Sequence, residues 1–271
     1  MGQGNLLETI VDATRLSVRE RKNIRSSETM ERIASSKVPR GKMFVAGFRR
    51  PDRFNIIAEC KRRSPSHGVL RDLYDPAKIA LDYESTGAAA ISVLTEPAFF
   101  DGALSHLECV RRTVEIPVLR KDFIVSRYQL VESLVHGADA VLLIVAALTQ
   151  AKLAELLTEA RSMGLAALVE VHSRMELMTA LGAGARLVGV NNRNLKTLEV
   201  DLQVSKNLIE MIPEDVVAIS ESGIRSAADL ISLRKLGFSG FLIGGSFMKA
   251  ANPGIALGKM VSELTAISQE Q

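Results

Sequence analysis

A glutamate and a lysine stand two residues apart at the end of a short apolar run. Glu59 and Lys61 follow the run 56–58, whose composition is typical of a buried β-strand. Because side chains alternate between the two faces of a strand, Glu59 and Lys61 point to one side and Cys60 points to the other. The pattern therefore holds an acid and a base side by side on one rigid element. The polar segment 62–68 follows as a loop.

Charged or amide side chains also follow most of the other apolar runs. By the same alternation, Lys121, Glu170 and Glu221 share one face of their strands. Burying such charges is costly unless opposite signs compensate, and nearby carboxylates keep a lysine protonated although burial alone lowers its pKa. A single charge at a strand end is typical of a solvated rim, whereas the whole set indicates an active site. The residues at these ends are Glu59, Lys61, Lys121, Glu170, Asn191, Arg193 and Glu221.

Eight apolar runs of strand length alternate with helical patterns from residue 56 onward. Near-continuous apolar strands joined by helices indicate a parallel sheet covered by helices. The count of eight favours an α/β fold closed into a (β/α)8 TIM barrel over an open doubly wound sheet. Gly137, Gly164 and Gly237 are expected to cap three of the helices. The predicted strands are Ile56–Cys60, Ala89–Leu94, Val118–Lys121, Ala138–Val145, Ala166–Val171, Leu187–Asn191, Val216–Ser220 and Gly240–Gly244.

Residues 1–45 precede the first predicted strand and contain no turn-rich linker. We expect them to form one or two additional N-terminal helices packed on the barrel, so that residues 1–271 form a single domain. The basic stretch 15–40 also contains three glutamates, a mixture typical of a solvated helical face rather than a nucleic-acid site.

Composition excludes several classes of protein. The net charge is only +3, which gives no indication of nucleic acid or an anionic membrane as partner. No apolar run is long enough to span a membrane. Cys60 and Cys109 are too few for a disulfide framework and fit a cytoplasmic protein with buried, reduced thiols. The histidines lack metal-ligand spacing, so we expect no metal site and interpret each as a surface or capping residue. They are His67, His106, His136 and His172.

Glycines follow the last two predicted strands, where barrels of this kind commonly bind phosphate. Ser222-Gly223 comes after the seventh strand and Gly244-Gly245-Ser246 after the eighth. Backbone N–H groups approach the anion there, and a short helix directs its positive N-terminus toward it. Glycine suits such an approach because a Cβ would block it, although tight turns alone also account for glycine.

Two further features each have two interpretations. Phe99 and Phe100 stand in a polar loop after the second strand, where they either cover an aromatic substrate or cap the barrel. Arg193 either binds a substrate carboxylate through a bidentate guanidinium contact or forms an ion pair at the rim of the barrel.

Six segments of the chain together match the motifs of one family. They are Glu59-Cys60-Lys61-Arg62-Arg63-Ser64-Pro65-Ser66, Leu94-Thr95-Glu96 with Phe100, Lys121-Asp122-Phe123-Ile124, Glu170-Val171-His172, Gly189-Val190-Asn191-Asn192-Arg193-Asn194-Leu195 and Ser220-Glu221-Ser222-Gly223-Ile224. In this combination the chain resembles the indole-3-glycerol-phosphate synthase family, from about Gly41 to its end. The resemblance implies a (β/α)8 barrel with extra N-terminal helices, and a carboxy-lyase of tryptophan biosynthesis. Such enzymes convert 1-(2-carboxyphenylamino)-1-deoxyribulose 5-phosphate to indole-3-glycerol phosphate, carbon dioxide and water.

The resemblance also implies roles for individual residues. Lys121 is the general acid that protonates the substrate carbonyl oxygen as the ring closes. Lys61 contacts the substrate carboxylate and assists acid steps, and the division of steps between the two lysines stays open. Glu170 is the proton acceptor of the later dehydration. The resemblance assigns orientation of the lysines and substrate hydroxyls to Glu59, Asn191 and Glu221, contact with the anthranilate part to Arg193 and Phe100, and the phosphate and its surroundings to Ser64, Gly223, Gly244 and Gly245.

The implied reaction needs no cofactor. Ring closure makes an aromatic carbon attack a ketone, and a protonated, positioned lysine supplies both the proton and the charge that the oxygen requires. Loss of the carboxylate then restores aromaticity without an electron sink. The expected partner is a small phosphorylated substrate, with no nucleic acid, membrane or metal, and association with other enzymes of the pathway stays open.

Two alternatives of other classes also stay open. In a Schiff-base aldolase barrel Lys121 would be the nucleophile, which requires a deprotonated lysine, whereas three nearby glutamates favour the charged form. A non-catalytic phosphate-binding barrel would keep the glycines but has no need for Lys61, Lys121 and Glu170 together.

Overall fold

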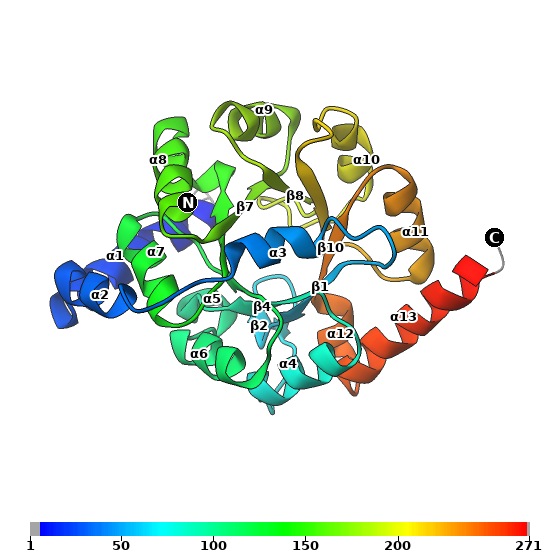
Figure 1. Cartoon of the computed structure of the whole chain (residues 1–271), viewed down its shortest axis with the longest axis horizontal. Helices are drawn as coiled ribbons and strands as arrows, with labels where there is room; N and C mark the ends of the chain where they lie inside the picture. Colours follow the sequence, from blue (N-terminus) through cyan, green and yellow to red (C-terminus); the bar gives the residue numbers. More distant parts are fainter. Residues whose placement is uncertain (1–5, 270–271) are drawn as a thin grey trace.

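The computed structural model describes residues 6–269, and its eight main strands form a closed parallel barrel (Figure 1). The first strand pairs with both its sequence neighbour and the last strand, which closes the cylinder and leaves no open edge. This confirms the predicted (β/α)8 TIM barrel, with every strand within two residues of its predicted ends. The strands are β1 (Ile56–Cys60), β4 (Ala90–Leu94), β5 (Val118–Lys121), β6 (Ala140–Ile144), β7 (Ala166–Val171), β8 (Leu187–Asn191), β9 (Val217–Glu221) and β10 (Gly240–Ile243).

Helices join successive strands and surround the barrel (Figure 1). Gly137, Gly164 and Gly237 follow three of them with φ of +85°, +78° and +113°, the left-handed conformation expected of helix C-caps. The segment predicted as a loop after β1 includes a short antiparallel pair, β2 (Arg63–Ser64) and β3 (Gly68–Val69). The helices are α4 (Pro76–Ser85), α5 (Pro97–Phe100), α6 (Leu104–Thr113), α7 (Arg127–Val135), η1 (Val145–Ala147), α8 (Gln150–Ser162), α9 (Arg174–Gly182), α10 (Gln203–Ile209), α11 (Ala227–Lys235), α12 (Gly245–Lys249) and α13 (Pro253–Gln269).

The alternation of side chains along the strands separates two apolar cores. Ala58 and Cys60 of β1 face outward and pack between the barrel and its helices. Leu119, Leu168 and Ile219 face inward and fill the barrel interior. The residues two positions later on the same strands therefore face the barrel axis as well, which confirms the shared face predicted for Lys121, Glu170 and Glu221.

Three helices precede β1, one more than the upper number predicted, and the third extends past residue 45. They are α1 (Leu6–Ile24), α2 (Ser27–Ala34) and α3 (Gly41–Gly47). Helix α3 crosses the end of the barrel where the strands begin (Figure 1), and Phe44 and Phe48 enter the interior core there. This packing supports our proposal that the chain forms one domain. Residues 1–5 of the expected extension lie outside the described residues.

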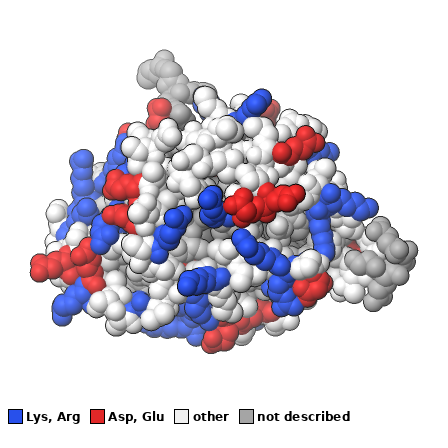
Figure 2. Space-filling model, turned by 45° about the horizontal axis from the view of Figure 1, so that its top comes forward, with Lys and Arg blue, Asp and Glu red and all other residues white. Residues whose placement is uncertain are grey.

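Charged side chains of both signs lie on the surface. Figure 2 shows Lys and Arg close to Asp and Glu over one face of the molecule. Arg21 Nε lies 2.7 Å from Glu132 Oε1, and Arg40 Nε lies 3.6 Å from Asp139 Oδ1. The basic N-terminal stretch is therefore partly paired with the barrel rather than fully solvated as predicted. Within residues 6–269, no helix combines the length and apolarity needed to cross a membrane.

Candidate active site

A pocket of about 610 Å³ opens at the C-terminal ends of the barrel strands. Its volume is in the usual range for sites that bind small organic molecules. Every strand of the barrel contributes at least one lining residue, and all the residues selected from the sequence lie there. These residues are Glu59, Lys61, Ser64, Phe100, Lys121, Glu170, Asn191, Arg193, Glu221, Ser222, Gly223, Gly244 and Gly245.

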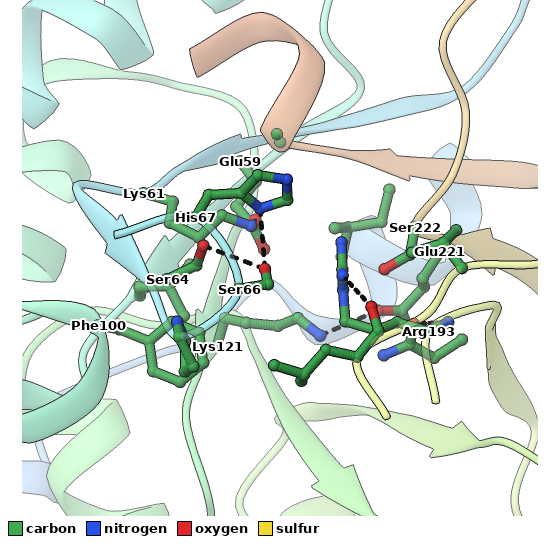
Figure 3. Close-up of a pocket in the computed structure, with 18 of the residues that line it drawn as sticks. Glu59, Lys61, Ser64, Ser66, His67, Phe100, Lys121, Arg193, Glu221 and Ser222 are labelled. Atoms are coloured by element: carbon green, nitrogen blue, oxygen red, sulfur yellow. Dashed lines mark hydrogen bonds and ion pairs between the residues drawn. The ribbon is translucent and has the colours of Figure 1, made fainter. Parts of the chain in front are cut away.

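Lys121 occupies the centre of a charged cluster in this pocket. Its Nζ donates to Glu170 Oε2 at 2.8 Å and to Glu221 Oε2 at 2.9 Å. The three residues come from alternate strands, whose inward side chains meet across the barrel axis. The glutamate side chains are only 3% and 1% exposed, so water screens these ion pairs little. Figure 3 shows the Lys121 side chain extending across the pocket toward Glu221.

The charges of this cluster shift one another's pKa. Burial disfavours the ammonium of Lys121, but the carboxylates of Glu170 and Glu221 outweigh it and raise the lysine pKa well above its usual value. Burial likewise disfavours the Glu170 carboxylate, but Lys121 and His172 hold its pKa below the usual value. Burial raises the pKa of Glu221 to about 7 against the opposing effect of Lys121. At neutral pH the cluster therefore contains a protonated lysine and an ionised Glu170.

The second acid–base pair lies on β1. Lys61 Nζ pairs with Glu59 Oε1, as the predicted alternation requires. Glu59 is buried and the Lys61 side chain is 18% exposed, so the lysine is the more accessible member. In the following loop, Ser66 Oγ lies 3.4 Å from Ser64 Oγ and 2.8 Å from His67 Nδ1 (Figure 3).

Apolar side chains line much of the remaining pocket. Strand β6 contributes Leu142 and Ile144, neither of which is ionisable. Phe100 lines the pocket with its ring centroid 6.2 Å from that of Phe123, which favours the substrate-cover interpretation. Helix α1 adds three side chains to which no site role was assigned from the sequence: Leu6, Leu7 and Ile10.

Phe100 is held by the helix that replaces the predicted loop. The carboxylate of Glu96 accepts the N–H groups of Ala98 at 2.9 Å and Phe99 at 2.7 Å, which caps α5 at its first turn. The cap is buried, so α5 carries Phe100 to the pocket wall on a fixed support.

The end of β8 fixes Arg193 and the neighbouring strand. Asn191 Oδ1 accepts the Arg193 N–H at 3.0 Å, and Arg193 Nη1 donates to the Leu198 carbonyl at 2.7 Å. The partner of the guanidinium is thus a backbone carbonyl, which does not support the rim ion pair. Asn192 is buried, and its Nδ2 donates to the Glu221 carbonyl at 2.9 Å, which anchors the end of β9.

Two glycines, Gly244 in the pocket lining and Gly189 on β8, make room for carboxylates. A Cβ at Gly244 would lie 2.2 Å from Glu59 Oε1 and 2.9 Å from Glu59 Cβ. A Cβ at Gly189 would lie 2.0 Å from Glu221 Oε1. Gly244 has φ of −130°, outside the left-handed region. A side chain at position 244 would meet Glu59, so glycine has a packing reason there that does not depend on a phosphate.

Gly223 and Gly245 differ from Gly244. Gly223 has φ of +85°, and its Cβ would lie 2.7 Å from Val200 Cγ1, so both the turn and the packing require glycine there. A Cβ at Gly245 would meet nothing within 4 Å. Gly245 is the first residue of α12, and packing does not require glycine at this position.

This difference gives a matched pair of substitutions. Gly244→Ala should lower kcat/KM about tenfold or more, because its Cβ displaces the Glu59 carboxylate from Lys61, and overpacking of this kind costs about 1–3 kcal/mol. Gly245→Ala should stay within about twofold of the unchanged protein, since its Cβ enters open space. Steady-state kinetics and thermal melts of both variants test the assignment. Equal kinetics for the two variants would contradict it.

Several polar residues near the site were missed or misjudged from the sequence, among them His67, which lines the pocket. Lys249 and Arg225 line the pocket beside the glycine turns, but neither follows a strand directly, so no rule selected them. His172 was interpreted as a surface or capping residue, but it precedes Ser173, which is the N-cap of α9, and its ring contacts Glu170. Its position two residues after Glu170, directly beyond the end of β7, was the signal that would have found it.

Comparison with known proteins gives one consistent result. The family model described as Indole-3-glycerol phosphate synthase matches residues 7–260. A protein of that name from Parafrankia sp. (strain EAN1pec) is 48% identical over 253 residues, which cover 92% of each chain. Another from Sulfurimonas denitrificans (strain ATCC 33889 / DSM 1251) is 44% identical over 257 residues, covering 94% of this chain and 98% of the relative.

Solved structures support the fold alone. The 3-hexulose-6-phosphate synthase from Salmonella typhimurium superposes with a TM-score of 0.64 at 12% identity, covering 79% of this chain and 99% of that one. The thiamine phosphate pyrophosphorylase from Pyrococcus furiosus gives a TM-score of 0.60 at 17% identity, covering 80% and 96%. The architecture is therefore shared with barrels of much lower sequence similarity.

Proposed function

The chain belongs to the indole-3-glycerol phosphate synthase family, and from this membership we propose how its own residues perform the reaction. The enzyme is a carboxy-lyase of tryptophan biosynthesis. It closes the ring of 1-(2-carboxyphenylamino)-1-deoxyribulose 5-phosphate, then releases carbon dioxide and water to form indole-3-glycerol phosphate. The observation that carries the residue assignment is Lys121 held between two buried carboxylates in the pocket.

Lys121 is the general acid of ring closure in this proposal. The attack of the aromatic carbon on the ketone develops negative charge on the ketone oxygen, and a positioned ammonium supplies a proton to it. Because the neighbouring carboxylates raise the lysine pKa, the amine is protonated before substrate arrives. The same shift argues against the Schiff-base alternative, which needs a neutral amine as nucleophile.

Glu170 acts after Lys121 for an electrostatic reason. In the resting site the Lys121 ammonium lies 2.8 Å from Glu170 Oε2 and makes Glu170 a weak base. Once Lys121 has given its proton to the substrate, that stabilising charge is gone and the pKa of Glu170 rises. Glu170 is then able to accept a proton during the dehydration. The order of the two steps follows from the shared contact.

The two ends of the substrate meet different parts of the pocket. We assign the anthranilate ring to the apolar wall with Phe100, and its carboxylate to Lys61 and Arg193, which supply positive charge nearby. Glu59 and Glu221 orient the two lysines through their ion pairs. Asn191 holds Arg193 through the backbone contact described above.

We assign the phosphate to the turns after β9 and β10. Ser222-Gly223 and Gly244-Gly245 line the pocket together with Ser64, and the first N–H groups of α12 lack partners within their own helix. Lys249 and Arg225 add positive charge to the same part of the pocket. Ser246 is less important, because its Oγ donates to the Ile224 carbonyl at 3.0 Å.

Inorganic sulfate should therefore compete with the substrate at millimolar concentrations and raise the melting temperature by mass action. Chloride at equal ionic strength is the control, because it screens charge without filling a phosphate site. Ser246→Ala should keep the sulfate effect, since the hydroxyl is engaged with the backbone. Crystals grown in sulfate that hold the anion elsewhere, with both turns empty, would contradict the assignment.

The activity itself has a direct assay. Adding the carboxyphenylamino-deoxyribulose phosphate should produce indole fluorescence, against which the chain contributes no Trp signal. Substrate binding without fluorescence would favour the non-catalytic phosphate-binding barrel. Borohydride with substrate should leave no covalent adduct on Lys121, whereas an adduct would favour the Schiff-base alternative.

A cytoplasmic location is also part of the proposal. Cys60 and Cys109 are free thiols, and Cys60 is buried in the outer core. Free thiols are typical of proteins in a reducing compartment.

A further inference from the structure

His172 stands directly after β7, two positions beyond Glu170. The alternation along the strand turns both side chains to the same side of the backbone. The imidazole is nevertheless behind Glu170, because Glu170 lines the pocket and His172 is not among the lining residues. Its side chain is 12% exposed, so the ring is largely enclosed by protein.

Both ring nitrogens of His172 face carboxylates. Nε2 lies 3.3 Å from Glu170 Oε1, and Nδ1 lies 3.0 Å from Glu176 Oε2. Glu176 also accepts the backbone N–H of His172 at 2.8 Å, and its own N–H donates to Ser173 Oγ at 3.3 Å. The first turn of α9 therefore fixes the Glu176 carboxylate, and Glu176 fixes the imidazole.

The two carboxylates that contact Lys121 are held in different ways. Glu170 Oε2 contacts Lys121 and its Oε1 contacts His172, so both oxygens face a potential cation. Glu221 Oε2 contacts Lys121, but its buried Oε1 has no hydrogen-bond partner within the described part of the chain. Both Glu170 oxygens thus have a cationic neighbour, Lys121 through a hydrogen bond and His172 Nε2 through an ion pair at 3.3 Å that lacks hydrogen-bond geometry.

We propose that His172, supported by Glu176, is a positioning residue that fixes the orientation and charge of Glu170. The proposal rests on the assignment of Glu170 as proton acceptor. His172 does not touch the substrate in this scheme. It holds one carboxylate oxygen while the other loses its contact with the Lys121 ammonium during the reaction.

The charge state of the ring follows from its surroundings. Within residues 6–269, the charged groups that contact it are Glu170 on β7 and Glu176 on α9. Burial disfavours the imidazolium, but the two carboxylates raise the pKa of His172 to about 9. The pKa values of His67, His106 and His136 are instead lowered, chiefly by burial. His172 therefore stays charged at neutral pH while the other three histidines are mostly neutral.

Histidine titration by NMR tests the contact without using activity. One of the four histidines should titrate well above the usual value of about 6.5, and its signal should vanish in His172→Gln. In Glu170→Gln and in Glu176→Gln its pKa should fall by at least about one unit. His136→Gln is the matched control, because it removes a histidine outside the pocket and should leave that signal unchanged. A His172 pKa near 6.5, unchanged in both glutamine variants, would overturn the proposal.

Kinetics on a double-mutant cycle then test the positioning role. His172→Gln should lower kcat about tenfold and change KM less than about twofold, since the step affected follows binding. In the Glu170→Gln background the same change should have less than about a twofold effect, because residues that act through one another are not additive. Equal losses in both backgrounds would indicate a merely structural role and overturn the proposal.

The variants also separate this proposal from the function on which it rests. Glu170→Gln could keep full activity and still lower the pKa of His172. That result would confirm the contact between His172 and Glu170 but exclude Glu170 as the proton acceptor. If His172→Gln does not fold, Glu176→Gln provides the same test, because it removes the support and leaves the ring in place. A Glu176→Gln variant with unchanged kcat and an unchanged His172 pKa would also overturn the proposal.

Discussion

Lys121→Ala is expected to lower kcat by at least about 100-fold, the effect of losing a positioned general acid. The substitution removes the only group that contacts both Glu170 and Glu221 among the described residues. The ketone oxygen then has neither proton donor nor compensating charge during ring closure. Steady-state kinetics with the indole fluorescence assay measure the loss. Retention of more than about a tenth of the original kcat would exclude the role.

Lys121→Arg is the matched control for the fold. Lys121→Ala leaves two buried carboxylates without their cation, and breaking a buried ion pair costs about 3–5 kcal/mol. Arginine keeps the charge but does not release its proton, because its pKa is above about 12. We expect Lys121→Arg to melt at a higher temperature than Lys121→Ala and yet to remain nearly inactive. An active arginine variant would show that charge alone is sufficient.

Glu170→Gln should lower kcat by about 100-fold or more with a KM change of less than about threefold. The amide keeps the size of the side chain but cannot accept a proton, so the transition state of the dehydration loses more than the ground state. Kinetics over a range of substrate concentrations separate the two parameters. A change in KM alone would make Glu170 a binding residue.

Glu221→Gln provides the comparison, because Glu221 contacts the same lysine nitrogen at nearly the same distance. If the two glutamates only keep Lys121 charged and oriented, both substitutions should have similar effects. If Glu170 is also the proton acceptor, Glu221→Gln should lower kcat by only about tenfold. Similar losses of kcat in the two variants would therefore exclude Glu170 as the proton acceptor.

The strands and their inward residues were predictable because one physical rule governs both. A strand buried on both faces must be apolar along its length, so a charged residue at its end stands out, as Glu170 does after Leu168. The two-residue alternation then predicts which face of the strand this charged side chain points to, without knowledge of the fold. This reasoning found the residues of the central cluster and most of the pocket wall.

Other features depend on contacts between segments that are distant in the sequence. Helix α1 lines the pocket, and its Arg21 pairs with Glu132, which is 111 residues away. Gly244 leaves space for the side chain of Glu59 on the neighbouring strand β1. Sequence patterns give the direction of a side chain but not its neighbour.

Two phenylalanines close the barrel at the end opposite the pocket, and this separation affects how the stability of the protein can evolve. Phe44 and Phe48 close the cylinder where the strands begin, their ring centroids 5.1 Å apart, and Gly240 leaves space for Phe48. The reacting groups all lie at the other end. Substitutions around α3 therefore alter the temperature at which the enzyme unfolds without touching the groups that transfer protons. Adaptation to heat or cold can proceed at one end while the reaction at the other is preserved.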